Sequence, residues 1–180
     1  MKMKLTTALC ASVMLLATAA FAGEGLELGS GVGAFTVTDV TGPEAGKSLC
    51  YRCRYGSQPV VSIFARQVND ELATLVKNVD QVVGQNKGEK MAAFVVLLSD
   101  DPTGQEGALK SLAKDHGITN TPLTVFDDKN GPPSYKITDA DFTVMMWVDG
   151  ELKVNETFKS GQLTPQAVTQ VVGKTGSILN

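Results

Sequence analysis

A nearly continuous apolar run from Pro59 to Ala65, reading Pro-Val-Val-Ser-Ile-Phe-Ala, is the feature that most constrains the fold of this chain. Such a run is typical of a β-strand that is covered on both faces. A segment with a helical apolar stripe follows it, and Cys50-Tyr-Arg-Cys53 precedes it by six residues. The run therefore predicts the central strand of an α/β domain.

The first 22 residues have the pattern of a cleavable export signal. Lys2 and Lys4 precede an uncharged segment from residue 5 to residue 19, and Ala20-Phe21-Ala22 supplies the small residues of a cleavage site. The apolar part is shorter than the ~20 residues that a membrane-spanning helix needs. We therefore expect residues 1–22 to be a signal peptide and the product to be periplasmic or extracellular, with no membrane attachment after cleavage.

The chain that remains after cleavage has 158 residues, enough for one domain. Without Lys2 and Lys4 it carries 14 basic and 19 acidic residues, a net charge of −5. An acidic chain with no basic cluster in its sequence is a poor partner for nucleic acid or for an anionic membrane. We expect a flexible glycine-rich segment at residues 23–33 and a single domain at residues 34–180. The oligomeric state cannot be read from the sequence.

Periodic apolar patterns predict alternating strands and helices. Helices are expected at about residues 71–83, 105–116 and 165–172, and strands at 34–40, 59–65, 91–98, 123–126, 143–148 and 152–158. Asp149-Gly150 between the last two strands is a strong hairpin signal. The loop from Gly42 to Ser48 is similar to a phosphate-binding loop, but three residues instead of four separate Gly42 from Gly46, and no helix is expected after Lys47. No nucleotide or other cofactor is expected.

The chain resembles the thioredoxin-like superfamily, and within it the peroxiredoxin or alkyl-hydroperoxide-reductase-like branch, from Ala34 to about Val172. The resemblance rests on the central strand, on the segment Gly117–Asp127 (Gly-Ile-Thr-Asn-Thr-Pro-Leu-Thr-Val-Phe-Asp), and on the terminal hairpin and helix. It implies a three-layer α/β fold with a central mixed sheet and helices on both faces. In the superfamily a proline equivalent to Pro122 is usually cis and lies beside the active-site helix. Thr121 and Pro122 are therefore expected to mark the site.

The chain departs from this family at the position of the reactive cysteine. In thioredoxins and peroxiredoxins that cysteine follows the central strand, at the start of the next helix, where backbone N–H groups stabilise its thiolate. Here Phe64 is followed by Ala-Arg-Gln-Val-Asn, without a cysteine. This absence removes the peroxidase reaction as the family performs it. Together with a lone histidine, His116, it also argues against the copper-chaperone members.

Cys50 and Cys53 are the one evident chemical pair in the exported chain, and three interpretations of them remain. The pair is a redox-active disulfide, a disulfide that only clips its loop, or two inert free thiols, and an oxidising compartment favours a disulfide. Arg52 and Arg54 favour the first, because cationic neighbours lower the pKa of a thiol. One Cys-x-x-Cys supplies only two of the four ligands that zinc prefers, so no metal is expected.

Two hypotheses about function follow from the pair. In the first, the protein exchanges disulfides with protein thiols through Cys50 and Cys53, with the attacking residue, the substrate and the direction of electron flow open. In the second, the protein is a non-catalytic thioredoxin-like binding or structural domain with a local disulfide. Function depends on the site and not on the fold, so the two stay open together.

Overall fold

Strand β3 (Val60–Ala65) lies inside the sheet, with a strand on each side, and is buried along its whole length, as its apolar run predicts. The computed structural model describes residues 25–179, so the expected signal peptide and its cleavage point lie outside the described residues. β3 pairs in parallel with β4 (Ala92–Leu98) and antiparallel with β6 (Phe142–Val148). The parallel pair is joined by a helix, the crossover expected from two successive buried strands.

The sheet is mixed and has seven strands in the order β2-β1-β5-β4-β3-β6-β7. The remaining strands are β1 (Val37–Asp39), β2 (Ser48–Leu49), β5 (Leu123–Phe126) and β7 (Glu151–Phe158). The hairpin of β6 and β7 turns at Asp149 and Gly150, whose φ angles of 54° and 76° are both positive. Asp-Gly suits such a turn because both residues tolerate this conformation, so the hairpin prediction is confirmed.

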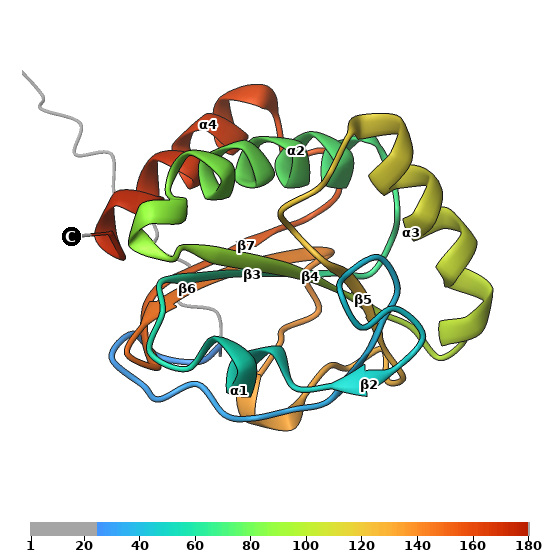
Figure 1. Cartoon of the computed structure of the whole chain (residues 1–180), viewed down its shortest axis with the longest axis horizontal. Coiled ribbons are helices and arrows are strands. Elements are labelled where there is room, and N and C mark those ends of the chain that lie inside the picture. The colour runs from blue at the N-terminus through green and yellow to red at the C-terminus, as the bar shows by residue number, and fades with distance from the viewer. Residues whose placement is uncertain (1–24, 180) are drawn as a thin grey trace, which may run out of the picture.

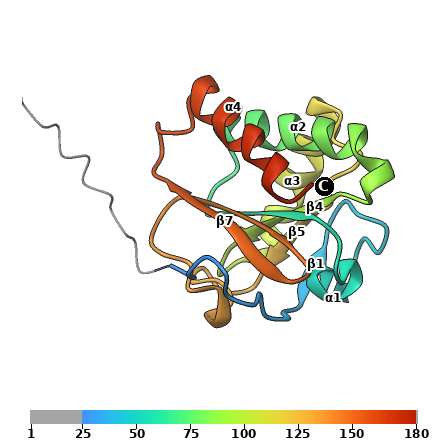
Figure 2. The ribbon, with the colours of Figure 1, turned by 90° about the vertical axis from the view of Figure 1, so that its left-hand side faces the viewer.

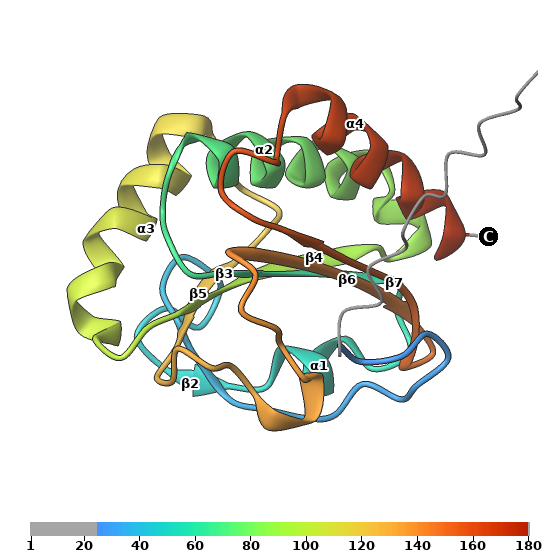
Figure 3. The ribbon, with the colours of Figure 1, turned by 180° about the vertical axis from the view of Figure 1, so that it is seen from behind.

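The two faces of the sheet are covered in different ways (Figure 1). On one face lie the three long helices, α2 (Asp70–Gln85), α3 (Pro102–His116) and α4 (Pro165–Gly173), as Figure 2 also shows. On the other face lies one short helix, α1 (Tyr51–Tyr55), beside irregular chain from the N-terminal part and from the region before β6 (Figure 3). Short 3-10 turns complete the chain at Lys87–Glu89, Pro133–Tyr135 and Lys174–Ser177. The three-layer arrangement is therefore confirmed, with a second helical layer of only five residues.

Two helices begin earlier than their apolar pattern indicates. α2 is capped by Asn69, whose side chain accepts a hydrogen bond from the Leu72 N–H at 3.0 Å, so Asp70 is its first residue. α3 starts at Pro102, because Asp101 caps it through the Gly104 N–H and proline is well suited to the first helical position.

Within the described part of the chain, no helix is both long and apolar enough to cross a bilayer.

The described part of the glycine-rich N-terminal segment lies along the terminal hairpin. Gly29 donates to the Leu152 carbonyl at 2.8 Å, Leu152 donates to the Ser30 carbonyl at 2.9 Å, and Val32 donates to the Gly150 carbonyl at 2.9 Å. Leu26 and Val32 are buried in the core on the α1 side of the sheet. Composition alone indicated a flexible segment, whereas these contacts tie residues 26–32 to the domain.

Candidate functional site

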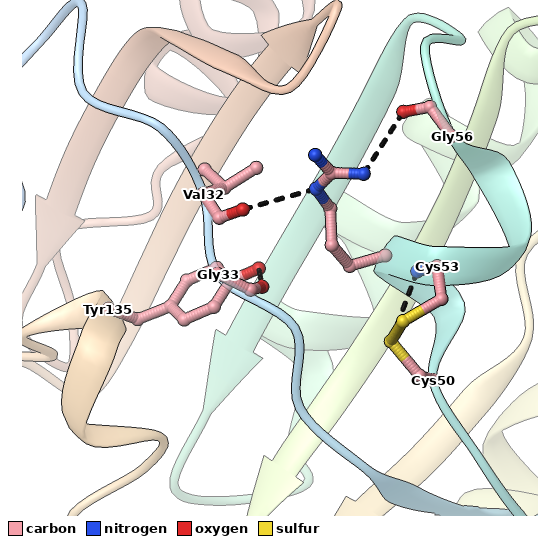
Figure 4. The surroundings of a disulfide bond; sticks show 7 residues. Val32, Gly33, Cys50, Cys53, Gly56 and Tyr135 are labelled. Atoms are coloured by element: carbon pink, nitrogen blue, oxygen red, sulfur yellow. Dashed lines mark hydrogen bonds between the residues drawn. A yellow bond between two sulfur atoms is a disulfide. The ribbon is translucent and has the colours of Figure 1, made fainter.

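Cys50 and Cys53 form a disulfide at the start of α1 (Figure 4). Their Cα atoms are 5.2 Å apart. Cys50 is the N-cap of α1, and its Sγ accepts a hydrogen bond from the Cys53 N–H at 3.0 Å. Gly56, with a φ of 58°, ends the helix after little more than one turn. The pair therefore lies on a single helical turn, which the sequence patterns did not include among the expected helices.

The two cysteines differ in accessibility. Cys53 is exposed and Cys50 is half-buried. Cys53 is therefore the more accessible residue to a thiolate from another protein. If it attacked there, the sulfur leaving the disulfide would be that of Cys50, which already holds a hydrogen bond from a backbone N–H.

A buried carboxylate holds α1 against the sheet. Tyr51 is 1% exposed, and its hydroxyl donates to Asp39 Oδ2 at 3.0 Å. Asp39 is also buried and accepts from the Gly42 N–H at 2.8 Å and the Glu44 N–H at 2.9 Å. The Tyr51 ring stacks on Phe94 of β4, with centroids 5.4 Å apart. Burial, and then the bond to Asp39, raises the pKa of Tyr51, so at neutral pH its hydroxyl remains a donor.

Arg52 ties α1 to two other segments. Its Nε donates to the Val32 carbonyl at 3.1 Å and its Nη1 to the Gly56 carbonyl at 3.3 Å, the two bonds drawn in Figure 4. Tyr135 donates to the neighbouring Gly33 carbonyl at 2.8 Å. The guanidinium of Arg52 therefore contacts backbone carbonyls, and its evident role is to position the helix that carries the cysteines.

Arg54 points to a different partner. Its Nη1 lies 3.6 Å from Glu44 Oε1 in a solvent-exposed ion pair. Lys47, and beyond it Arg54, lowers the pKa of Glu44 below its ordinary value. Of the two arginines beside the cysteines, Arg52 thus binds two backbone carbonyls and Arg54 binds a carboxylate.

Replacing Gly150 with alanine should test the Arg52 contacts. A Cβ at Gly150 would lie 2.4 Å from Arg52 Nη2, and the φ of 76° there is unfavourable for alanine. We expect a loss of about 1–2 kcal/mol in the free energy of unfolding, part of it from displacing Arg52. Urea denaturation should show that Arg52→Ala and Gly150→Ala together cost less than the sum of the single changes. Strict additivity would contradict the contact.

Thr121 and Pro122 lie in the loop before β5, and the expected cis bond is not there. No cis peptide bond occurs among the described residues, so Thr121–Pro122 is trans. The trans form needs no special support, because it is the favoured isomer of most X–Pro bonds. β4 separates β5 from β3. The antiparallel neighbour of β3 is β6, and its Phe142 lies opposite Ala65, just before α2 begins. The loop beside the start of α2 is therefore the one before β6.

The start of α2, where the family places its cysteine, is occupied by structural contacts. Arg66 donates through Nε to the Ala140 carbonyl at 2.9 Å, through Nη2 to the Thr138 carbonyl at 2.8 Å, and through Nη1 to the Lys129 carbonyl. This arginine fastens the loop before β6 to the end of β3. Thr121 and Pro122 instead border a groove together with Arg54 and Tyr55 of α1. They are thus near the helix that carries the cysteines, by a different geometry from the one expected.

Other candidate residues have structural positions. His116 is the last residue of α3. Trp147, an aromatic residue that could line a binding surface, is instead fully buried in the hairpin, and Asp100, in the loop after β4, pairs with Lys129 at 2.9 Å. Across residues 25–179, no three His, Cys, Asp or Glu side chains come close enough together to hold a metal ion. Asp39 and the positioning contacts of Arg52 were not found from the sequence. The only signal for Asp39 was its inward position in an alternating strand.

Comparison with known proteins gives matches at the level of structure. No protein-family model matches the chain. No curated protein matches it either. A candidate thiol:disulfide interchange protein DsbE from Chlorobium tepidum superposes with a TM-score of 0.67 at 12% identity, covering 86% of this chain and 99% of that one.

Two further solved structures are similar. A candidate protein disulfide isomerase from Bacteroides thetaiotaomicron has a TM-score of 0.64 at 14% identity, covering 86% of this chain and 91% of that chain. AhpC of Mycobacterium tuberculosis also has a TM-score of 0.64, at 10% identity, with coverage of 84% and 97%. Together with the strand order and the helix positions, these matches show that the chain has a thioredoxin-like fold.

Proposed function

We propose that this protein is an exported thiol–disulfide exchange protein that acts through Cys50 and Cys53. The observation that carries the proposal is the disulfide on a surface helix, with Cys53 exposed and the Cys50 sulfur bonded to a backbone N–H. The similar structures include a candidate disulfide interchange protein and a candidate disulfide isomerase, which makes protein thiols a reasonable substrate class. The export-signal pattern of residues 1–22 supports a location in which disulfides persist.

The exchange can be written with the oxidised protein as the acceptor of two electrons. A substrate thiolate attacks Cys53 Sγ, a mixed disulfide forms, and the Cys50–Cys53 bond breaks. Cys50 leaves as a thiolate that accepts the Cys53 N–H. A second thiol of the same substrate, once deprotonated, attacks the substrate sulfur that is bonded to Cys53, and Cys53 leaves as a thiolate. The substrate is then oxidised to a disulfide, and Cys50 and Cys53 are reduced to two thiols after protonation. The same steps in reverse reduce a substrate disulfide.

A non-catalytic thioredoxin-like domain is the second candidate. Its support is the start of α2, where Arg66 and its three carbonyl partners occupy the region that carries the reactive cysteine in the family. In that case the disulfide would only stabilise α1. The loop that it closes is very short, so the entropic stabilisation would be modest.

The reduction potential of the pair separates the two candidates. Equilibration with glutathione buffers and thiol trapping should give a potential between about −120 and −270 mV, the range of known exchange catalysts. The protein should also accelerate insulin reduction by a dithiol, and Cys50→Ser and Cys53→Ser should each abolish that acceleration. A pair that stays oxidised below about −300 mV, or that shows no turnover, would leave the disulfide as a structural clip.

A further inference from the structure

Three shallow depressions next to α1 join into one groove. The first and the middle depression share Tyr55 and Asn120, and the middle and the last share Thr41, Ile118 and Thr119. The middle depression includes Arg54, the residue that follows the exposed Cys53. The groove therefore runs past the helix that carries the disulfide. We name it the cationic groove after the basic side chains that border it: Arg54, Lys87, Lys90, Lys110 and Lys114.

The charge of this groove is opposite to that of the chain. Five basic residues border it and no aspartate or glutamate does, although the chain has 19 acidic and 16 basic residues. The five come from α1, α3 and the turn after α2, which explains why no basic cluster is visible in the sequence. The fold has gathered positive charge at one place on an acidic molecule.

Most of this charge is available to a ligand. Within residues 25–179, Lys87, Lys90 and Lys114 have no ion-pair partner, while Arg54 pairs with Glu44 and Lys110 with Glu106. Both pairs are exposed and therefore weak. The nearby carboxylate of Asp80 is already engaged by the N–H groups of Thr119 and Asn120 and by the Asn120 side chain. An incoming carboxylate would thus meet three lysines that have no ion-pair partner among the described residues.

We propose that the cationic groove docks acidic, extended polypeptide segments of the proteins whose thiols or disulfides react at Cys50 and Cys53. The identity of these partners rests on the proposed function, while the binding itself does not. Complementary charge raises the association rate and selects among partners. A segment lying in the groove would pass Arg54 and so bring its own sulfur near Cys53. A long nucleic acid fits less well, because the rest of this acidic protein repels an extended polyanion.

Binding of a cysteine-free acidic peptide to the purified, oxidised exported protein tests the proposal. A fluorescent peptide of about ten residues would extend over about 33 Å. Its affinity, measured by anisotropy, should fall when glutamine replaces its acidic residues and when ionic strength rises from about 0.01 M to 0.15 M. The double variant Lys87→Glu/Lys114→Glu should bind at least about tenfold more weakly.

A matched variant with the same net charge serves as the control. Lys77 on α2 and Lys153 on β7 are outside the groove, so Lys77→Glu/Lys153→Glu should keep the affinity within about twofold. Equal losses in the two double variants would overturn the proposal, since only net charge would then matter. A single-stranded oligonucleotide that binds the groove as tightly as the peptide would also overturn it.

The outcome is separate from that of the redox experiment. The peptide has no sulfur and the protein stays oxidised, so groove-dependent binding can be found even if exchange fails. With an acidic dithiol peptide as substrate, the groove variant should raise KM and leave kcat unchanged, which a loss of redox chemistry would not do.

Discussion

Replacing Asp39 with alanine is expected to lower the free energy of unfolding by about 3 kcal/mol, to be measured by urea denaturation. The carboxylate accepts three hydrogen bonds, from the Gly42 and Glu44 N–H groups and from the Tyr51 hydroxyl. Tyr51 is buried, so its hydroxyl would lose its partner where water cannot easily replace it. A buried donor without a partner costs about 1–3 kcal/mol. The loss would also release α1, and with it Cys50 and Cys53, from the sheet.

Tyr51→Phe is the matched control for this substitution. It removes one of the three hydrogen bonds and keeps the stacking on Phe94 and the two backbone bonds to Asp39. We expect a cost of about 1 kcal/mol. If Asp39→Ala costs no more than Tyr51→Phe, the buried carboxylate does not hold the loop and the helix together. The free energy that the Asp39 carboxylate loses by leaving water would then equal the free energy that it gains from its hydrogen bonds.

Stability is expected to fall steeply above about pH 10, because all three tyrosines of the chain resist ionisation when folded. Burial is the first cause of the raised pKa at Tyr51, Tyr55 and Tyr135. In the unfolded chain each phenol ionises near pH 10. Above that pH the unfolded state binds fewer protons than the folded state, so the free energy of unfolding decreases as pH rises. Three retained protons give a limiting slope of about 4 kcal/mol per pH unit.

The near-ultraviolet absorbance of phenolate, followed together with circular dichroism, measures this effect. Phenolate should appear together with unfolding and not before it. Tyr55→Phe should reduce the slope by about one third, because it removes one of the three linked protons. Gradual phenolate formation from pH 10 in a protein that stays folded would show that the tyrosines are accessible.

The elements that the sequence predicts well are those whose pattern is local. The apolar run of β3 and the three- and four-residue spacing of Leu72, Leu75 and Val79 in α2 can be recognised within one element, because burial on a face imposes them directly. The Asp149-Gly150 turn is equally local, since it depends on two residues that accept a positive φ.

The candidate site depends on contacts between distant segments, which explains why less of it could be predicted. Arg52 reaches Val32, 20 positions away, and Tyr51 reaches Asp39, 12 positions away. No periodicity links such positions. Pro122 does not lie beside the start of α2 for a related reason: the loop at that place precedes the strand that adjoins β3, and that strand is β6 and not β5. The groove beside it is likewise assembled from α1, α3 and several loops.

The N-terminal segment along the hairpin also bears on the solubility of the domain. β7 is an edge strand of eight residues, long enough to pair with a strand of another molecule. Gly29 and Ser30 take up the outward-facing N–H and C=O of Leu152, and Asn155 donates from its side chain to the Leu26 carbonyl at 2.8 Å. At the opposite edge β2 is only two residues long. The sheet thus has one edge that is too short for intermolecular pairing and one that its own chain covers at Glu151, Leu152 and Asn155. A protein without residues 1–33 would leave this part of β7 free to pair with a strand of another molecule and so to aggregate.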